Sequence, residues 1–359
     1  MDDEIFYAVA LSLIKGIGPV YFKKLIDQFK SPKEVFEKPL EALYDAVPKS
    51  IAKRIYDEKD FVKTERILRI CERHDIKIYS YGMEGYPKRL LHIHTPPPML
   101  YVKGDITEVD RIKTVGIVGT RRPSQYGVQV AEWFSRELSK HSIGIVSGGA
   151  YGIDTIALKK AKEENAYAIA VLGNGLLNPY PSSNRELFKD IVEKGGAIIS
   201  EFLPEERPNK ENFPKRNRII SALSDIVLVV EAGKKSGSLI TAAWAEEQNK
   251  DVYAIPGPIT KETSEGTNHL IQKGARIALS PDNILQDLGI SHKKEERKID
   301  ISEEEKNILE MLSDEPLHFD TILEKSNMEV FNLYSILFGM ELKGLIRQLP
   351  GKYYVRAFL

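Results

Sequence analysis

Cysteine is almost absent from this sequence, since Cys71 is the only one among 359 residues. A single thiol excludes a framework of intramolecular disulfides and a zinc site with several cysteine ligands, and it is typical of a reducing compartment. Long apolar runs are also missing: no stretch reaches the roughly 18 residues that mark a membrane-spanning helix. The first residues, MDDEIFYAVA, lack the basic start of a signal peptide. We therefore expect a cytoplasmic protein without membrane contact.

A strong net charge is missing too, because 51 Lys and Arg residues stand against 52 Asp and Glu residues. This balance gives no general attraction to nucleic acid, so the distribution of charge has to decide such a function. Residues 1–75 hold 14 basic and 14 acidic residues, residues 76–300 hold 31 and 28, and residues 301–359 hold 6 and 10. Only the middle of the chain is net positive.

Residues 1–78 are expected to form a helical domain. In LIKGIGPVYFKKLIDQF, Gly16 and Gly18 flank Ile17, and Pro19 suits the first position of a helix. Apolar residues then recur at helical spacing, at Phe22, Leu25, Ile26 and Phe29. The pattern predicts a SAM-like or helix-hairpin-helix unit. Backbone N–H groups at such a turn can bind a phosphate, but the even charge of this block favours packing or protein contact, and both uses stay open.

Residues 79–291 alternate apolar strands with helical segments, which predicts an α/β domain with a doubly wound parallel sheet. The strands are near-continuous apolar runs, as in sheets that are covered on both faces. They are expected at residues 114–119, 143–148, 167–173, 196–202, 225–232, 251–257 and 275–279. Ligands bind such sheets beyond the carboxyl ends of the strands, so a site should lie in the loops that follow these runs.

The end of the chain is predicted to be a linker and a winged helix. Residues 292–300, HKKEERKID, are too rich in charge to bury a face and are interpreted as the linker. Residues 301–359 begin with a capping box, Ser302 and Glu305, and continue with helical segments and a strand hairpin. The third helix, residues 328–342, contains no Lys or Arg. This favours a role in protein contact or structure over duplex DNA binding.

Motifs for cofactor or catalytic chemistry are missing from the loops. The glycines at 116, 119 and 127 do not fit the dinucleotide fingerprint, and EAGKKSGS lacks the first glycine of a P-loop. His92 and His94 have no acidic residue or cysteine nearby, so we expect neither a metal site nor a cofactor. Glu201 and Glu231, each at the end of a strand, are the only candidates for an acid–base pair.

Several loops at the expected ligand edge are instead suited to anions. SGGAYGID leads into the start of a helix, and Gly237 precedes another, so N–H groups and the helix dipole favour a phosphate at both places. Asp154, at the end of the first of these segments, is expected to cap its helix. Basic residues of the same edge are Arg121, Arg122, Lys210, Lys215, Arg216 and Arg218.

Phe213, followed by Pro214 in the basic segment NFPKRNR, can offer its ring to a nucleic-acid base. Stacking of this kind is tolerant of base identity, so the pattern indicates a single-strand binder. Two alternatives stay open. Phe213 could pack beneath its loop, and Arg216 or Arg218 could form an internal ion pair with Glu201, Glu231 or Asp225.

Taken together, these segments resemble the DNA processing protein A family (DprA, also called Smf). The resemblance rests on VGIVGTRRPSQYG, IVSGGAYGIDTIAL, AVLGNGLLNPYPSSN, GAIISEF, FPKRNRIISALSDIVLVVEAGKKSGSLITAAWAEEQNKDVYAIPGPI and EGTNHLIQKGA, in this order. It implies a Rossmann-like domain that binds single-stranded DNA, protects incoming strands in natural transformation and loads the RecA recombinase. The family has no established catalytic activity, so the resemblance implies that the protein is not an enzyme.

The resemblance also assigns residues. It implies that Arg121, Lys210 and Phe213 form the DNA pocket, with the glycine loop and the arginines of FPKRNR around it, and that the sheet domain forms a homodimer near residues 270–290. The residues predicted at the DNA site, from the loops and the resemblance together, are Arg121, Arg122, Ser147, Gly148, Gly149, Gly152, Lys210, Phe213, Lys215, Arg216, Arg218, Gly237 and Asn268.

An enzyme is the alternative hypothesis, because the lysine-decarboxylase-like phosphoribohydrolases, which process nucleotides, have a related sheet. Those enzymes carry PGGxGT followed by a catalytic glutamate. Here the corresponding segment is AGKKSGS followed by Leu239. This departure favours the DNA binder.

Overall fold

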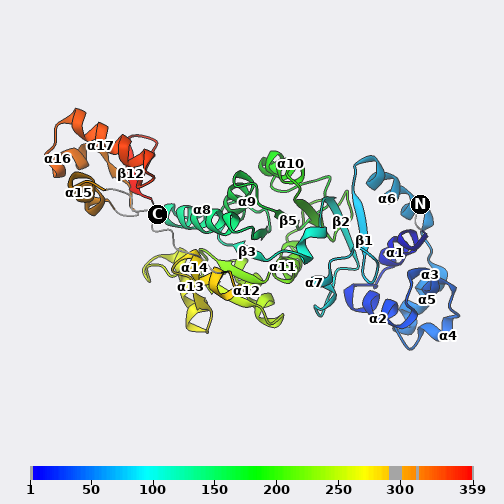
Figure 1. The fold of residues 1–359 in the computed structure, drawn as a ribbon. Helices are drawn as coiled ribbons and strands as arrows, with labels where there is room; N and C mark the ends of the chain where they lie inside the picture. Colours follow the sequence, from blue (N-terminus) through cyan, green and yellow to red (C-terminus); the bar gives the residue numbers. More distant parts are fainter. Residues whose placement is uncertain (1–2, 291–300, 313–314, 358–359) are drawn as a thin grey trace.

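The computed structural model describes residues 3–290, 301–312 and 315–357. The expected linker at residues 292–300 lies outside the described residues. The centre of the molecule is a sheet (Figure 1) built from β1 (Lys77–Ser80), β2 (Met99–Gly104), β3 (Thr114–Val118), β4 (Gly144–Ser147), β5 (Ala168–Leu172), β6 (Ala197–Ser200), β7 (Ile226–Val229), β8 (Asp251–Ala254) and β9 (Arg276–Ile277). The order of these nine strands is β1-β2-β6-β5-β4-β3-β7-β8-β9.

All seven strands expected from their apolar runs are confirmed, and neighbours from β6 to β9 are parallel. The chain proceeds from β3 outward to β6, then returns to β7 on the other side of β3. The sheet is therefore doubly wound, with its reversal of order between β3 and β7. Two strands escaped prediction: β1 pairs antiparallel with β2, and β2 pairs antiparallel with β6.

Helices cover both faces of the sheet, because right-handed crossovers that run in opposite directions from β3 place their helices on opposite sides. Figure 1 shows α8, α9 and α10 on one side and α11 and α12 on the other. The helical segments between β1 and the end of the sheet domain are α7 (Lys88–Leu91), η1 (Thr107–Asp110), α8 (Gln125–Lys140), α9 (Ile153–Glu163), η2 (Ser182–Asn184), α10 (Arg185–Glu193), α11 (Asn212–Ala222), α12 (Ser238–Glu247), α13 (Glu262–Gln272) and α14 (Pro281–Asp287).

The N-terminal helices pack against the β1 edge of the sheet. They are α1 (Asp3–Leu13), α2 (Pro19–Phe29), α3 (Pro32–Glu37), α4 (Leu40–Leu43), α5 (Lys49–Asp57) and α6 (Phe61–Arg73). Pro19 opens α2 as expected. Tyr81 joins the two parts, since its hydroxyl donates to Asp27 (3.0 Å) and accepts from Lys23 (2.9 Å). The buried apolar residues of helices and sheet form one continuous core.

The C-terminal part is a winged helix with a core of its own. It contains α15 (Glu303–Met311), β10 (Leu317–His318), α16 (Phe319–Ser326), α17 (Val330–Leu342), β11 (Ile346–Leu349) and β12 (Tyr353–Arg356), with strand order β10-β12-β11. The predicted capping box is confirmed: Ser302 N donates to Glu305 Oε2 (2.9 Å), and Glu305 N donates to Ser302 Oγ (3.1 Å). Across the described ranges, none of the helices combines the length and the apolar character needed to cross a membrane.

Candidate functional site

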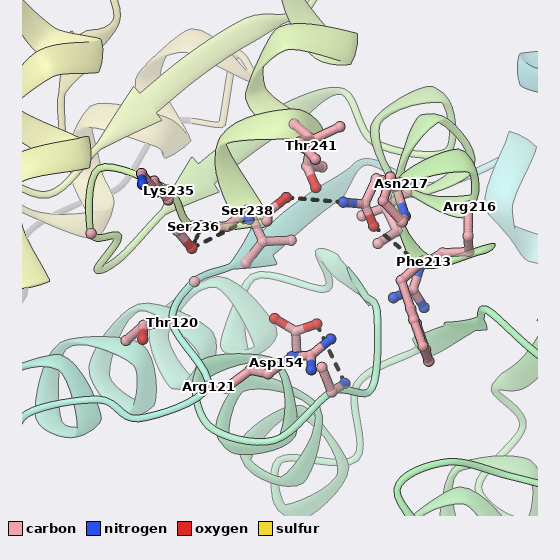
Figure 2. A pocket seen from close by; sticks show the side chains of 18 of the residues that line it. Thr120, Arg121, Asp154, Phe213, Arg216, Asn217, Lys235, Ser236, Ser238 and Thr241 are labelled. Carbon is pink, nitrogen blue, oxygen red and sulfur yellow. Dashed lines mark hydrogen bonds between the residues drawn. The ribbon is translucent and has the colours of Figure 1, made fainter. Parts of the chain in front are cut away.

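A cavity of about 1020 Å³ opens at the carboxyl ends of the central strands. It lies where the strand order reverses between β3 and β7, the place at which ligands bind doubly wound sheets (Figure 2). Its walls come mainly from the loops after β3 and β7 and from the start of α11. The residues that line it include Thr120, Arg121, Ala150, Asp154, Tyr180, Lys210, Phe213, Arg216, Asn217, Lys234, Lys235, Ser236, Gly237, Ser238, Thr241, Glu262 and Glu265.

The loop after β3 carries Arg121 and is hydrogen-bonded to Glu231. The Glu231 carboxylate is buried and accepts hydrogen bonds from Ser124 N (2.8 Å) and Ser124 Oγ (2.5 Å). Thr120 N donates to the Glu231 carbonyl (2.7 Å). A Cβ at Gly127 would stand 2.2 Å from Glu231 Oε2, so α8 can pass the carboxylate only with glycine at this position. Glu231 thus fixes the base of the loop.

The glycine loop after β4 approaches the β3 loop closely. Gly152 has φ +78°, and a Cβ there would lie 2.3 Å from the Thr120 carbonyl oxygen. Gly149 has φ +63°, and a Cβ there would lie 2.9 Å from the Phe188 ring. Both positions combine a left-handed backbone with close contact, which only glycine tolerates without strain. Ser147 is fully buried and donates to the Ile117 carbonyl (2.6 Å), which ties β4 to β3.

Asp154 and Arg216 are both buried, line the cavity and attract each other electrostatically. A Cβ on Gly148 would come within 2.7 Å of both Asp154 Oδ2 and Arg216 Nη2. Burial raises the pKa of Asp154 to about 6, opposed by the positive charge of Arg216 and by backbone N–H groups. Burial likewise lowers the pKa of Arg216 to about 10, opposed by Asp154.

The expectation that Asp154 caps α9 is wrong. Gly152 is the N-cap residue, and Asp154 is already the second residue of the helix. Its Oδ2 accepts from Ala150 N (3.4 Å) in the glycine loop. The reason is the tight turn at Gly152, which starts the helix two residues earlier than the sequence indicates, so that the carboxylate bonds back to the loop.

The arginines of α11 make internal contacts. Arg216 Nη1 donates to the carbonyl oxygens of Gly148 (2.7 Å) and Val171. Arg218 forms a two-pronged pair with Glu201, Nη1 to Oε1 at 2.5 Å and Nη2 to Oε2 at 2.6 Å, and both side chains are at most 10% exposed. The open alternative of an internal ion pair is therefore realised by Arg218 with Glu201.

Arg121, Lys210 and Phe213 meet at the cavity. Both cations are exposed, and Arg121 Cζ lies 5.6 Å from the centroid of the Phe213 ring. The ring is half-buried: one side packs on Gly173, where a Cβ would lie 2.6 Å from Phe213 Cδ1, and the ring also lines the cavity. Phe213 thus packs beneath its loop and still contributes to the cavity wall, which combines the two alternatives.

The other predicted site residues fall into two groups. Gly237 lines the cavity as the N-cap of α12, and its carbonyl accepts from Asn217 Nδ2 (3.1 Å). Arg122 and Lys215 are exposed but outside the lining, and the Asn268 amide is bonded to the Gly257 backbone (2.9 and 3.2 Å). Contact of any of these residues with DNA stays a prediction.

Four residues of the site region escaped the sequence analysis. Lys234 and Lys235 are exposed and line the cavity from the loop before α12. Tyr180 lines the cavity, and Tyr151 contacts Tyr180 with 6.2 Å between ring centroids. The lysines stand in EAGKKSGS, a segment that by its pattern is only an imperfect P-loop. The sequence around the two tyrosines gives no signal that they are exposed.

This arrangement is suited to bind a ligand that has both an anionic group and a flat ring. Cations, the start of α12 and an aromatic wall are suited to phosphate and base. The two candidate acid–base carboxylates are both engaged elsewhere, Glu201 by Arg218 and Glu231 by Ser124. In the described part of the chain, no group of three or more His, Cys, Asp or Glu residues could hold a metal ion.

Comparisons with known proteins agree with this geometry. The model of the family described as DNA recombination-mediator protein A matches residues 77–289, and that of the DprA winged helix domain matches residues 292–352. Protein Smf of Synechocystis is 32% identical over 396 aligned positions, which cover 99% of this chain and 99% of that protein.

Solved structures give the same result. DprA from Streptococcus pneumoniae superposes with a TM-score of 0.69 at 31% identity, covering 79% of this chain and 97% of that one. DprA from Helicobacter pylori, whose structure is described for its single-stranded DNA binding mode, gives a TM-score of 0.53 at 34% identity, covering 59% and 95%. Because the family model matches the sheet domain and a relative matches nearly the whole chain, the chain belongs to the DNA recombination-mediator protein A (DprA/Smf) family.

Proposed function

We propose that the cavity binds single-stranded DNA, with a phosphate at Arg121 and Lys210 and a base on Phe213. The observation that carries this proposal is the meeting of two exposed cations and an aromatic ring at the switch point of the sheet. Arg121 is exposed, so rotation of its side chain opens the ring face to a base. Only an unpaired base can reach such a face, and stacking is tolerant of its identity.

The similarity to DprA of Helicobacter pylori, whose structure shows a single-stranded DNA binding mode, supports this proposal. On the same basis we propose a role in natural transformation and recombination, in which the protein covers incoming strands and loads the RecA recombinase without catalysing a reaction. We further propose a homodimer through residues 270–290. Exposed apolar side chains on this segment, Ile277 at 47% and Leu279 at 70%, are consistent with a partner there.

Binding of fluorescent oligo-dT over a salt series tests the DNA site. We expect Arg121→Ala and Lys210→Ala each to make the dependence of log K on log salt shallower by about 0.7, the loss of one single-strand phosphate contact. Phe213→Ala should weaken binding by about 1 to 3 kcal/mol and leave the salt dependence unchanged, because it removes stacking and no charge.

Matching duplex is the control ligand, and it should bind more weakly than the single strand. Arg66→Ala is the matched protein control, because Arg66 is exposed on α6 in an ion pair with Glu205. Wild-type binding by all three site variants would contradict the assignment of the site. Release of free base from a nucleoside monophosphate would instead support the alternative of a nucleotide-processing enzyme.

A further inference from the structure

A row of aromatic rings leads from the cavity to the surface. Phe213 lines the cavity, Tyr180 lines it with a ring centroid 5.8 Å from that of Phe213, and Tyr151 follows at 6.2 Å from Tyr180. The two tyrosines are exposed to 36% and 44% of their surface. Rings that serve only packing are buried more completely, since aromatic side chains gain most when they leave water. Exposed Tyr180 thus contacts the ring assigned above to a base, and exposed Tyr151 contacts Tyr180.

The two segments that carry the tyrosines are joined to each other. Asn184, buried in η2, donates from Nδ2 to the Gly149 carbonyl (3.0 Å) and to Thr155 Oγ1 (2.6 Å). Thr155 Oγ1 in turn donates to the Ala150 carbonyl (2.6 Å). The glycine loop with Tyr151 and the segment with Tyr180 are therefore held in one arrangement before any ligand arrives. A preformed surface loses little conformational entropy on binding.

We propose that Tyr180 and Tyr151 continue the base-binding path from Phe213, so that a single strand leaves the cavity over these two rings. The proposal rests on the function proposed above and adds the route of the strand beyond the first base. Arg185, the first residue of α10, is exposed five positions after Tyr180 and offers a cation near the same path. Successive aromatic rings with cations beside them are how proteins bind single strands without sequence preference.

Unpaired DNA is the occupant that the observations favour over a folded protein partner. The row starts with half-buried Phe213 inside a cavity that is lined by cations, and it continues over two exposed rings at intervals of about 6 Å. A duplex hides the faces of its bases in its own stack, so it cannot use such rings. Each ring can accept one base of a strand that is already held in the cavity.

The test compares oligo-dT strands of about three and about twelve nucleotides, a range that spans short and full single-strand sites. Tyr151→Ala should raise the dissociation constant of the long strand by about 5- to 150-fold, because one stacked base is lost. The short strand ends within the cavity, so its affinity should not change. A long strand with abasic positions beyond the first bases should bind wild type and Tyr151→Ala equally.

Further variants separate the ring from the fold. Tyr151→Phe should restore binding, because it keeps the ring and loses only the hydroxyl, and Tyr180→Leu should repeat the defect of Tyr151→Ala. Tyr56→Ala is the matched control, since Tyr56 is 57% exposed on α5, away from the sheet edge that carries the cavity.

Wild-type binding of the long strand by both Tyr151→Ala and Tyr180→Leu, with Phe213→Ala defective, would overturn the path and leave the proposed function intact. If Phe213→Ala also binds both strands normally, the function proposed above fails together with the path. A defect of Tyr151→Ala that is equal for the abasic and the normal strand would show that the ring contacts no base, and would overturn the path as well.

Discussion

The sheet cavity and the winged helix are both places where nucleic-acid binding would be expected, but they present opposite surfaces. At the cavity, exposed Arg121 and Lys210 stand beside an aromatic ring. Helix α17 of the winged helix contains neither Lys nor Arg between Val330 and Leu342, and it exposes Phe331 to 81% and Phe338 to 64%. The helix that often reads DNA in this fold therefore exposes apolar rings here and has no cation among its own side chains.

The difference teaches that the arrangement of charge decides function where the fold leaves it open. Phosphate contacts supply most of the affinity of non-specific DNA binding, and α17 cannot make them with its own side chains. Exposed apolar groups in a cluster mark a contact with protein instead. The two regions are therefore expected to differ in energy as they do in composition.

The largest effect is expected for stability at the cavity. Arg218→Ala should lower the free energy of unfolding by about 3 to 5 kcal/mol, because it leaves the nearly buried Glu201 carboxylate without its partner. In the winged helix, Lys343 pairs with Glu305 at 2.7 Å with 39% of its side chain exposed. Glu305 is only 8% exposed but keeps its hydrogen bond from Ser302 N, so Lys343→Ala should cost less than Arg218→Ala. Urea unfolding measures both values, and equal losses would erase this contrast.

The second largest difference between the two regions is expected in their contribution to DNA affinity. The double variant Arg121→Ala/Lys210→Ala should weaken binding of oligo-dT by about 150-fold or more, because each lost bond to a charged group costs about 1.5 to 3 kcal/mol. Its counterpart in the winged helix, Lys325→Ala/Arg356→Ala, removes two exposed cations and should leave the affinity nearly unchanged. Fluorescence anisotropy at one salt concentration suffices. A larger loss for the second pair would assign the DNA to the winged helix.

A smaller effect is expected from pH. Burial raises the pKa of Asp154 from 3.8 to about 6, so the folded protein takes up a proton in a range where the unfolded chain has released it. The free energy of unfolding should therefore fall as pH rises from about 4 to 6. Protonation also removes a negative charge from the cavity lining, so affinity for DNA should rise as pH falls from 7 to 5.

Asp154→Asn is the variant that isolates this titration, because it keeps the shape of the side chain and loses the charge. Its DNA affinity should be as high at pH 7 as at pH 5, apart from changes shared by other groups. A pH profile identical to that of the wild-type protein would show that Asp154 does not influence the bound strand.

The smallest effect is expected when the winged helix is removed. Its core is separate from that of the sheet domain, so a chain that ends at residue 290 should fold and bind oligo-dT as the full chain does. Phe331→Ser should likewise leave DNA affinity unchanged, because the ring is 81% exposed and belongs to the apolar face of α17. Loss of DNA binding in either variant would contradict the prediction that the winged helix serves protein contact or structure.

Much of the fold could be predicted because its signals are local. The seven apolar runs predicted their strands, Pro19 predicted the start of α2, and the pair Ser302 and Glu305 predicted the cap of α15. Strands β1 and β2 could not be predicted in the same way. They join the sheet through antiparallel pairing with distant segments, and β1 has only four residues, of which one is buried.

The candidate site was predictable in its residue types but not in their partners. Arg121, Lys210 and Phe213 come from different loops, and their meeting follows from the rule that parallel strands end at one edge. The sequence could not show that Arg218 pairs with Glu201, because the pairing depends on the folded structure. There, the Glu231 carboxylate accepts from Ser124 and the Asp225 carboxylate pairs with Arg89.

The continuous core of the N-terminal helices and the sheet has a consequence for heating. Sequence pattern predicts three domains, whereas the buried apolar residues of the described ranges form two clusters. Elements that share one core unfold together, since exposing part of it destabilises the remainder. A calorimetric scan of the full chain should therefore show two heat-absorption peaks, with the helices around α2 melting in the same peak as the sheet.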